Sequence, residues 1–160
     1  FGRFGLSLNM EKTRMVDFQK PSGMGQTPDS FDFLGFTHYW GKSRQGWPTH
    51  KVKTAKDRLA RSCRAINLWC RKNMHRPVEE QSRQLNWKLR GHYGYYGITH
   101  NMRALRQYYL RVCRIWHAWL NRRGNRERLT WDCYCGLLLR HPLSSPRILH
   151  NLYRPCECSV

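Results

Sequence analysis

Residues 90–102, RGHYGYYGITHNM, place three glycines and three tyrosines between two segments of helical periodicity. A phosphate-binding loop is one interpretation, but the glycines do not form the dinucleotide-binding pattern, and no Gly-Lys-Ser/Thr sequence follows them. Tyr93 and Tyr96 are spaced about one helical turn apart, so a helix that continues into the segment would bury both rings. We therefore predict a helix–helix junction, in which one helix ends with a cap at Gly97 and the next begins after Asn101.

Apolar residues recur at helical spacing on both sides of this junction. Four predicted helices begin after an N-cap at Thr54, at Pro77, after Asn101, and after an N-cap at Thr130. The fourth covers residues 131–139, and PLSSPR, residues 142–147, is expected to be a turn-rich tail. The inward faces of the first three should hold Ala55, Leu59, Cys63, Ile66 and Cys70, then Val78, Leu85, Leu89 and Tyr96, then Leu105, Tyr109, Val112, Trp116 and Trp119.

The residues before the helices have strand and loop signals instead. Residues 6–18 predict a turn and a short strand over residues 13–16, and residues 19–30 predict a loop. The aromatic stretch 31–40 predicts a strand with a bulge or close approach at Gly35, and residues 41–53 predict a basic loop or hairpin. The expected fold class is therefore α+β and mostly α, with a short strand-bearing part followed by a basic helical bundle.

The charge of the chain is the strongest indication of a partner. The 160 residues include 29 Lys and Arg against 10 Asp and Glu, which gives a formal net charge of +19 and a pI near 10.3. A polyanion best offsets such self-repulsion, so nucleic acid is the leading partner class. An anionic membrane is a weaker alternative, because the basic residues are spread over the chain and no 18-residue apolar run occurs. The first residue is Phe, and we expect the sequence to be part of a longer protein.

Seven cysteines indicate a reducing compartment rather than a disulfide framework. Cys63, Cys70 and Cys113 fall on helical apolar patterns, as buried reduced thiols do, so a cytoplasmic location is expected. The pairs Cys133/Cys135 and Cys156/Cys158 have C-x-C spacing, whereas zinc ligands usually have C-x2-C or wider spacing. We therefore expect no metal site, and we expect these thiols to pack in the interior.

The outward faces of the predicted helices are basic. On the third helix, Arg103, Gln107, Arg111 and Arg114 point away from the apolar stripe, and on the first helix Arg58, Arg61, Arg64 and Lys72 do the same. A solvated surface would explain one such helix, but two with few acidic residues favour a phosphate-tracking surface. The candidate RNA-binding residues are Arg61, Arg64, Arg90, His92, Tyr95, Arg103, Gln107, Arg111 and Arg114.

Three segments resemble one protein family. GLSLNMEKT (5–13) followed by FDFLGF (31–36) resembles the end of a reverse transcriptase palm. KLRGHYGYYGITHNMRALRQYYLRVCRIWHAWL (88–120) is similar to the thumb, or maturase-specific region, of bacterial group II intron reverse transcriptases. The resemblance spans roughly residues 1–153 and implies three parts. These are a palm edge at 1–40, a helical thumb at 41–125, and a short C-terminal helix and tail at 126–160.

The family resemblance implies RNA-directed DNA synthesis together with assistance to intron splicing and mobility. The expected partners are intron RNA, an RNA template and a DNA primer. Lys12 matches a lysine proposed as general acid for the leaving pyrophosphate, a role that an ammonium near the phosphates could fill. Phe33, Leu34, Gly35 and Phe36 match the turn that grips the 3′ end of the primer. Without the resemblance, Lys12 would be interpreted as a surface lysine and the two phenylalanines as core residues.

The sequence departs from the family at the catalytic centre. The family holds Mg²⁺ with a Tyr-x-Asp-Asp turn and an upstream aspartate, and no adjacent Asp-Asp occurs here. The Mg²⁺ of the full-length enzyme would therefore have its ligands outside this sequence. We expect residues 1–160 to be inactive as a polymerase by themselves.

Two other functions stay open at the level of the sequence. One is a stand-alone RNA-binding module that helps splicing without a polymerase. The other is a helix-turn-helix DNA-binding domain, which is disfavoured because the junction at 91–97 is long and aromatic for such a turn. The sequence gives no indication of the oligomeric state.

Overall fold

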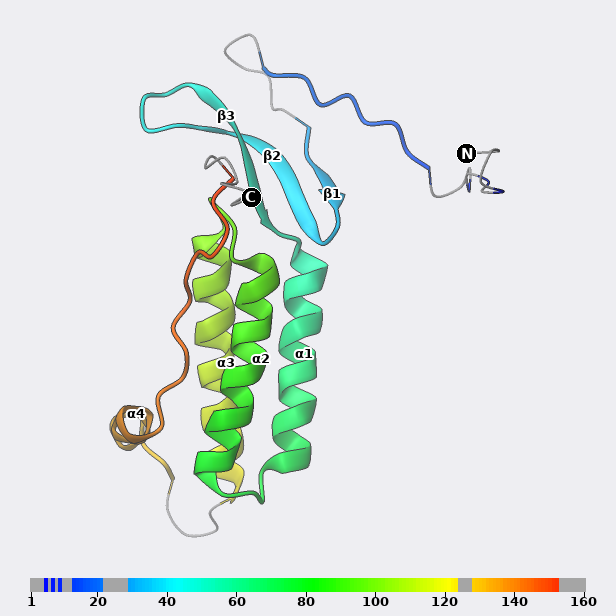
Figure 1. Ribbon diagram of the computed structural model, residues 1–160. Coiled ribbons are helices and arrows are strands. Elements are labelled where there is room, and N and C mark those ends of the chain that lie inside the picture. The colour runs from blue at the N-terminus through cyan, green and yellow to red at the C-terminus, as the bar shows by residue number, and fades with distance from the viewer. Residues whose placement is uncertain are drawn as a thin grey trace, which may run out of the picture. The chain divides into compact units, whose positions relative to one another are not determined.

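The computed structural model describes residues 13–21, 29–123 and 128–152, together with Gly5, Ser7 and Asn9. Its elements are β1 (Phe31–Phe33), β2 (Phe36–Lys42), β3 (Pro48–Thr54), α1 (Lys56–Asn73), α2 (Val78–Tyr96), α3 (Met102–Arg123) and α4 (Trp131–Arg140) (Figure 1). The fold is therefore α+β and mostly helical. The chain forms two compact units, residues 1–51 and 52–160, which are described in turn. Residue 40, the predicted end of the palm segment, lies inside β2.

The chain forms a three-stranded antiparallel sheet in the order β1-β2-β3, of which the first unit contains all but the last three residues of β3. The predicted single strand over residues 31–40 is wrong, because the chain reverses between Phe33 and Phe36, which pair with each other. Leu34 and Gly35 have φ of 49° and 82°, and a two-residue turn with two positive φ values matches the twist of the strands that it joins. Residues 13–16 form no strand: their side chains are exposed, and the Thr13 N–H donates to the Asn9 carbonyl four residues earlier rather than to a neighbouring strand.

The helix starts of the second unit depend on tertiary contacts as well as on local signals. The predicted N-cap at Thr54 is wrong, since Thr54 ends β3 and its hydroxyl accepts a hydrogen bond from Asn101 Nδ2 at 2.8 Å. Pro77 is the N-cap of α2 rather than its first helical residue. The N-cap at Thr130 is confirmed, because its hydroxyl accepts a bond from the Cys133 N–H.

The core of the second unit lies between α1, α2 and α3. Figure 1 shows the three helices side by side, with α1 and α3 running in one direction and α2 in the other. The predicted inward faces are confirmed as buried or partly buried, and Tyr93, Tyr108, Cys113 and Tyr134 join them. The buried polar side chain of Gln81 is paired on both sides: its Oε1 accepts a bond from Trp116 Nε1, and its Nε2 donates to two carbonyls of the α1–α2 turn.

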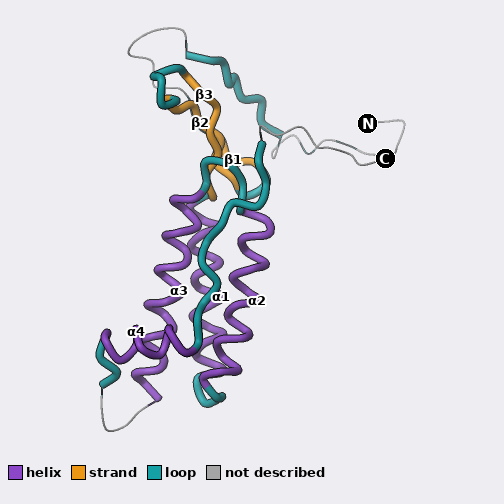
Figure 2. The backbone as a smooth tube through the Cα atoms, turned by 60° about the vertical axis from the view of Figure 1, so that its left-hand side comes forward, coloured by secondary structure: helices purple, strands orange, loops and turns teal. Residues whose placement is uncertain are grey.

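Residues 142–151 are not the expected turn-rich tail. Figure 2 shows this segment as an extended loop that runs back along the helices. Asn86 holds its start, accepting a bond from the Ser144 N–H and donating one to the Pro142 carbonyl. Its end pairs with the α2–α3 junction, where Leu149 and His150 both donate their N–H to the Gly97 carbonyl. We call residues 142–151 the C-terminal strap.

Gly97 is required at the junction because of close packing. Its φ is −77°, so no left-handed conformation is involved, although it does end α2 as predicted. A Cβ at this position would lie 2.3 Å from the Tyr93 carbonyl oxygen and 3.0 Å from that of Arg147. The glycine therefore lets the C-terminal strap approach α2.

The cysteines agree only in part with the prediction. Cys70 and Cys113 are buried and Cys63 is half-buried, as expected of packing thiols. Cys133 and Cys135 lie on α4 but are exposed, so the prediction that they pack in the interior is wrong. Cys156 and Cys158 lie outside the residues that the structure describes. None of the helices in the described ranges is both long enough and apolar enough to cross a membrane.

Candidate nucleic-acid interface

The predicted arginines of α1 and α3 are exposed, as the helical period required. Arg61 and Arg64 on α1 and Arg103, Arg111 and Arg114 on α3 all lie on the surface. None of them forms an ion pair with another residue that the structure describes. The ion pairs among the described residues are Arg58–Asp57 and Arg76–Glu80. Gln107 is exposed among the arginines of α3. These guanidinium groups are available to an external anion.

Residues 81–123 contain no Asp or Glu. This stretch covers nearly all of α2 and the whole of α3, and it has nine Lys and Arg. A polyanion that contacts this stretch would therefore meet no carboxylate within it, whereas Glu79 and Glu80 lie just before it in the first turn of α2.

The arginines on α1 and α3 are not all on one face. Arg111 lies beside Cys63, where its charge partly offsets the burial that raises the pKa of that thiol. Arg64 projects on the side of α1 that faces α3, by the 100° step of a helix. Arg61 points the other way, toward Tyr96. Burial raises the pKa of the Tyr96 hydroxyl, and the positive charges of the nearby Arg58 and Arg61 reduce this rise. Arg64 and Arg111 therefore lie on the α1–α3 side of the surface, and Arg61 belongs to a different part of it.

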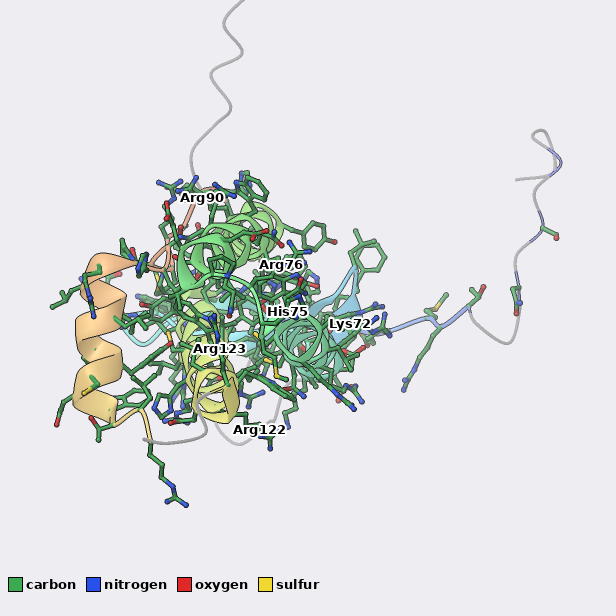
Figure 3. All side chains as sticks on the ribbon, turned by 90° about the horizontal axis from the view of Figure 1, so that it is seen from below. Lys72, His75, Arg76, Arg90, Arg122 and Arg123 are labelled. Carbon is green, nitrogen blue, oxygen red and sulfur yellow. The ribbon has the colours of Figure 1, made fainter. Side chains whose placement is uncertain are left out.

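A second basic cluster lies at the end of the bundle where α1 and α3 finish. Figure 3 looks along the helices toward this end and labels most of its members. Arg123 donates a hydrogen bond to the Arg76 carbonyl at 2.8 Å, which joins α3 to the α1–α2 turn. We call this group the basic end, and it consists of Arg71, Lys72, His75, Arg76, Arg122 and Arg123.

The prediction missed the basic end, although the sequence has a signal for it. Arg71 and Lys72 occupy the last turn of α1, and Arg122 and Arg123 occupy the last turn of α3. In a three-helix up-down-up bundle, the first and third helices end on the same side. Their basic last turns also complement the carbonyl ends of the helix dipoles.

His92 and Tyr95 lie in different environments. The His92 ring stacks on Tyr108 with centroids 3.8 Å apart, and it also contacts Tyr96. Burial lowers the pKa of His92 to about 4, and its Nε2 is buried without a hydrogen-bond partner in the described part of the chain. His92 thus belongs to the packing between α2 and α3, and its role as an RNA contact stays a prediction. Tyr95 is 53% exposed and remains a candidate for stacking on a base.

Arg90 is fixed by the C-terminal strap. Its side chain is exposed on α2, and its Nε donates to Ser144 Oγ at 3.2 Å. A pocket of about 280 Å³ lies beside it.

The Phe33–Phe36 turn belongs to the first unit and presents apolar side chains to solvent. Phe33 is 58% exposed and Leu34 67% exposed at the tip, whereas Gly35 and Phe36 are partly buried. A groove of about 850 Å³ runs beside β1 and is lined by Arg14, Val16, Phe18, Asp29, Ser30, Phe31, Asp32 and Phe33. The turn and the groove form a surface on which a sugar or base could rest.

The remaining predictions concern the general acid and the metal ligands. Lys12 lies outside the residues that the structure describes. Within the described ranges, no three His, Cys, Asp or Glu side chains come together as metal ligands. Asp32 accepts a hydrogen bond from the Thr37 hydroxyl across the β1–β2 hairpin.

Comparison of the chain with protein-family models, with curated proteins and with solved structures finds no match.

Proposed function

We propose that this chain is an RNA-binding part of a group II intron-encoded reverse transcriptase and maturase. The observation that carries the proposal is the helical surface of residues 81–123, where exposed arginines occur without a single carboxylate. Backbone phosphates are the partner that such a surface fits best, because each contact releases a counterion. Structured RNA, rather than duplex DNA, is the substrate class that we assign to it.

The division of roles within the proposed enzyme follows the two units. The helical unit would contact intron RNA and the template backbone through Arg64, Arg111 and the basic end. The hairpin turn at Phe33–Phe36 would contact the 3′ end of the DNA primer. In the full-length enzyme, Mg²⁺ would be held by carboxylates outside this chain, and Lys12 would act as general acid.

The two rival functions differ in what they require. A stand-alone splicing helper would use the same helical surface without primer contacts at the turn. A helix-turn-helix domain would need two helices that cross at about 90–120°, whereas α2 and α3 run antiparallel side by side (Figure 1). The helix arrangement therefore favours the RNA-binding functions over the DNA-binding one.

The test is a competition binding assay with the 160-residue chain. A labelled group II intron RNA should be displaced by unlabelled structured RNA at far lower concentration than by duplex DNA of equal phosphate content. Displacement at equal concentrations would show only a charge effect and would contradict the proposal. Primer extension on an RNA template with Mg²⁺ should give no product with this chain, and template-dependent product would contradict its proposed role as a part without catalytic carboxylates.

A further inference from the structure

The pocket between α2 and the C-terminal strap has the composition of an anion site. Arg90 and Tyr93 line it from α2, and Ser144, Ser145, Arg147 and Leu149 line it from the strap. Both arginine side chains are exposed, and no carboxylate is among the lining residues. Its volume is about 280 Å³, at the lower end of the range for ligand pockets, which suits a small group rather than a whole nucleotide chain.

Hydrogen bonds with α2 fix the position of Ser144 in the wall of the pocket. Its N–H donates to Asn86 Oδ1 at 2.6 Å, and its carbonyl accepts from the Tyr93 hydroxyl at 3.1 Å. Its Oγ accepts from Arg90 Nε at 3.2 Å, so the hydroxyl hydrogen of Ser144 is left to donate to a ligand. The same bond orients the Arg90 guanidinium, whose terminal nitrogens remain available.

The other wall is fixed at the helix junction. The Gly97 carbonyl accepts from the Leu149 N–H at 2.7 Å and from the His150 N–H at 2.9 Å. Arg147 lies two residues before this anchor, and its carbonyl packs against the open side of Gly97. The strap is thus tied to α2 on both sides of Arg147, and the pocket is formed before any ligand arrives.

We propose that this pocket binds a phosphate group of RNA between Arg90 and Arg147. The inference rests on the proposed RNA-binding function and adds a defined subsite to it. Two guanidinium groups supply paired N–H donors that match phosphate oxygens, and the hydroxyls of Ser144 and Ser145 supply two more. The phosphate comes from a 5′-terminal monoester or from an internal phosphodiester, which share this chemistry.

The test compares two double variants with the same change in charge. Arg90→Gln with Arg147→Gln alters the pocket, and Arg128→Gln with Arg140→Gln alters two exposed arginines, one before α4 and one at its end, that do not line it. The first probe is inorganic phosphate, whose binding is monitored through the backbone amide NMR signals of the strap. The second probe is a 12-nucleotide single-stranded RNA that carries either a 5′-phosphate or a 5′-hydroxyl. Circular dichroism of each variant must match the parent. If the Arg90 substitution disturbs folding, Arg147→Gln alone serves as the pocket variant.

We expect the pocket variant to lose the phosphate-induced shifts of Ser144 and Ser145 and to bind RNA more than about tenfold more weakly than its control. The slope of log K against log salt should become shallower by roughly 0.7 for each lost contact. A loss confined to the 5′-phosphorylated RNA identifies the terminal monoester, and an equal loss with both RNAs identifies the phosphodiester.

Two different results would overturn the two proposals separately. If the parent binds RNA and the pocket variant equals its control with both probes, the pocket does not bind phosphate. If the parent does not bind the group II intron RNA of the competition assay, the proposed function fails, and the inorganic phosphate titration then decides the pocket by itself.

Discussion

Asn101 and Thr54 form two reciprocal hydrogen bonds in the interior of the helical unit. Asn101 Oδ1 accepts from the Thr54 N–H at 2.8 Å, and Asn101 Nδ2 donates to the Thr54 hydroxyl at 2.8 Å. The same Nδ2 also donates to the Tyr96 carbonyl at the end of α2. One side chain at the start of α3 therefore joins the end of β3 to the end of α2.

Asn101→Ala should lower the free energy of unfolding by about 2–3 kcal/mol, because a buried N–H and a buried hydroxyl lose their partner. Urea denaturation followed by circular dichroism measures it. Asn67→Ala removes one bond from Trp119 Nε1 at the surface and should cost less than about 1 kcal/mol. Equal losses of unfolding free energy in the two variants would show that the interior hydrogen bonds of Asn101 contribute no more stability than the surface hydrogen bond of Asn67.

Replacing Arg103, Arg111 and Arg114 with Gln should weaken RNA binding without unfolding the chain. Exposed substitutions usually change stability by no more than about 0.5 kcal/mol each. The salt dependence should flatten by roughly 0.7 to 0.9 for each lost phosphate contact. The control, Arg44→Gln with Arg128→Gln and Arg140→Gln, removes the same charge from exposed arginines outside residues 81–123. If both variants give the same slope, the α3 arginines are only solvated.

Trp116→Ala should have the opposite effect from the arginine variants. Trp116 is fully buried, and its Nε1 donates to Gln81 Oε1 at 2.9 Å. Its loss should cost about 3–5 kcal/mol and leave Gln81 without one partner. Thermal unfolding measures the loss, and RNA affinity should fall only at temperatures where the variant is unfolded. Weaker binding by the folded variant would place Trp116 in the interface.

The stability of the helical unit should fall as the pH drops from about 6.5 toward 4. His92 has a folded-state pKa of about 4 because of burial, so below 6.5 the unfolded chain binds a proton that the folded chain does not. His92→Phe keeps an aromatic ring against Tyr108 and removes this proton uptake. The difference in unfolding free energy between variant and parent should therefore grow in favour of the variant as the pH falls from 7.5 to 5. A constant difference would contradict the buried neutral state of His92.

Thiol reactivity should separate the described cysteines into two groups. Cys133 and Cys135 are exposed on α4, whereas burial raises the pKa of Cys70 to about 12 and also raises that of Cys113. Since the thiolate is the reactive form, alkylation at pH 8 mapped by mass spectrometry should label the α4 pair first. Equal labelling rates in the folded protein would contradict the packing, and equal rates in 6 M guanidinium are the control.

The sequence predicted those parts of the fold that depend on local periodicity. The spacing of Leu59, Ile66 and Cys70 is sufficient to define one face of α1, and the same step placed Arg103 and Arg114 in solvent. The Thr130 cap was equally local. These features need only residues within a few positions of each other, so one sequence contains all the information for them.

Features that depend on distant partners were missed or misassigned. Threonine is a common N-cap residue, but the Thr54 hydroxyl accepts a hydrogen bond from the Asn101 side chain instead of capping α1. No local sequence pattern reveals this distant partner. PLSSPR has the composition of a turn, yet Ser144 pairs with Asn86 and Tyr93 across the fold. The stacking of the His92 ring on Tyr108 was not predicted, because it depends on how α2 meets α3.

The C-terminal strap has a consequence for the order in which the molecule folds. The α1–α2 and α2–α3 connections are short, so these helices can associate through contacts between neighbours as soon as each is synthesised. The Gly97 carbonyl finds its partners only when Leu149 and His150 have been made, which closes a much longer loop. On a ribosome, the helices and their arginines would therefore be in place while the pocket of Arg90 and Arg147 still lacked one wall. The proposed affinity of the helices for polyanions would therefore arise earlier in synthesis than the proposed phosphate subsite.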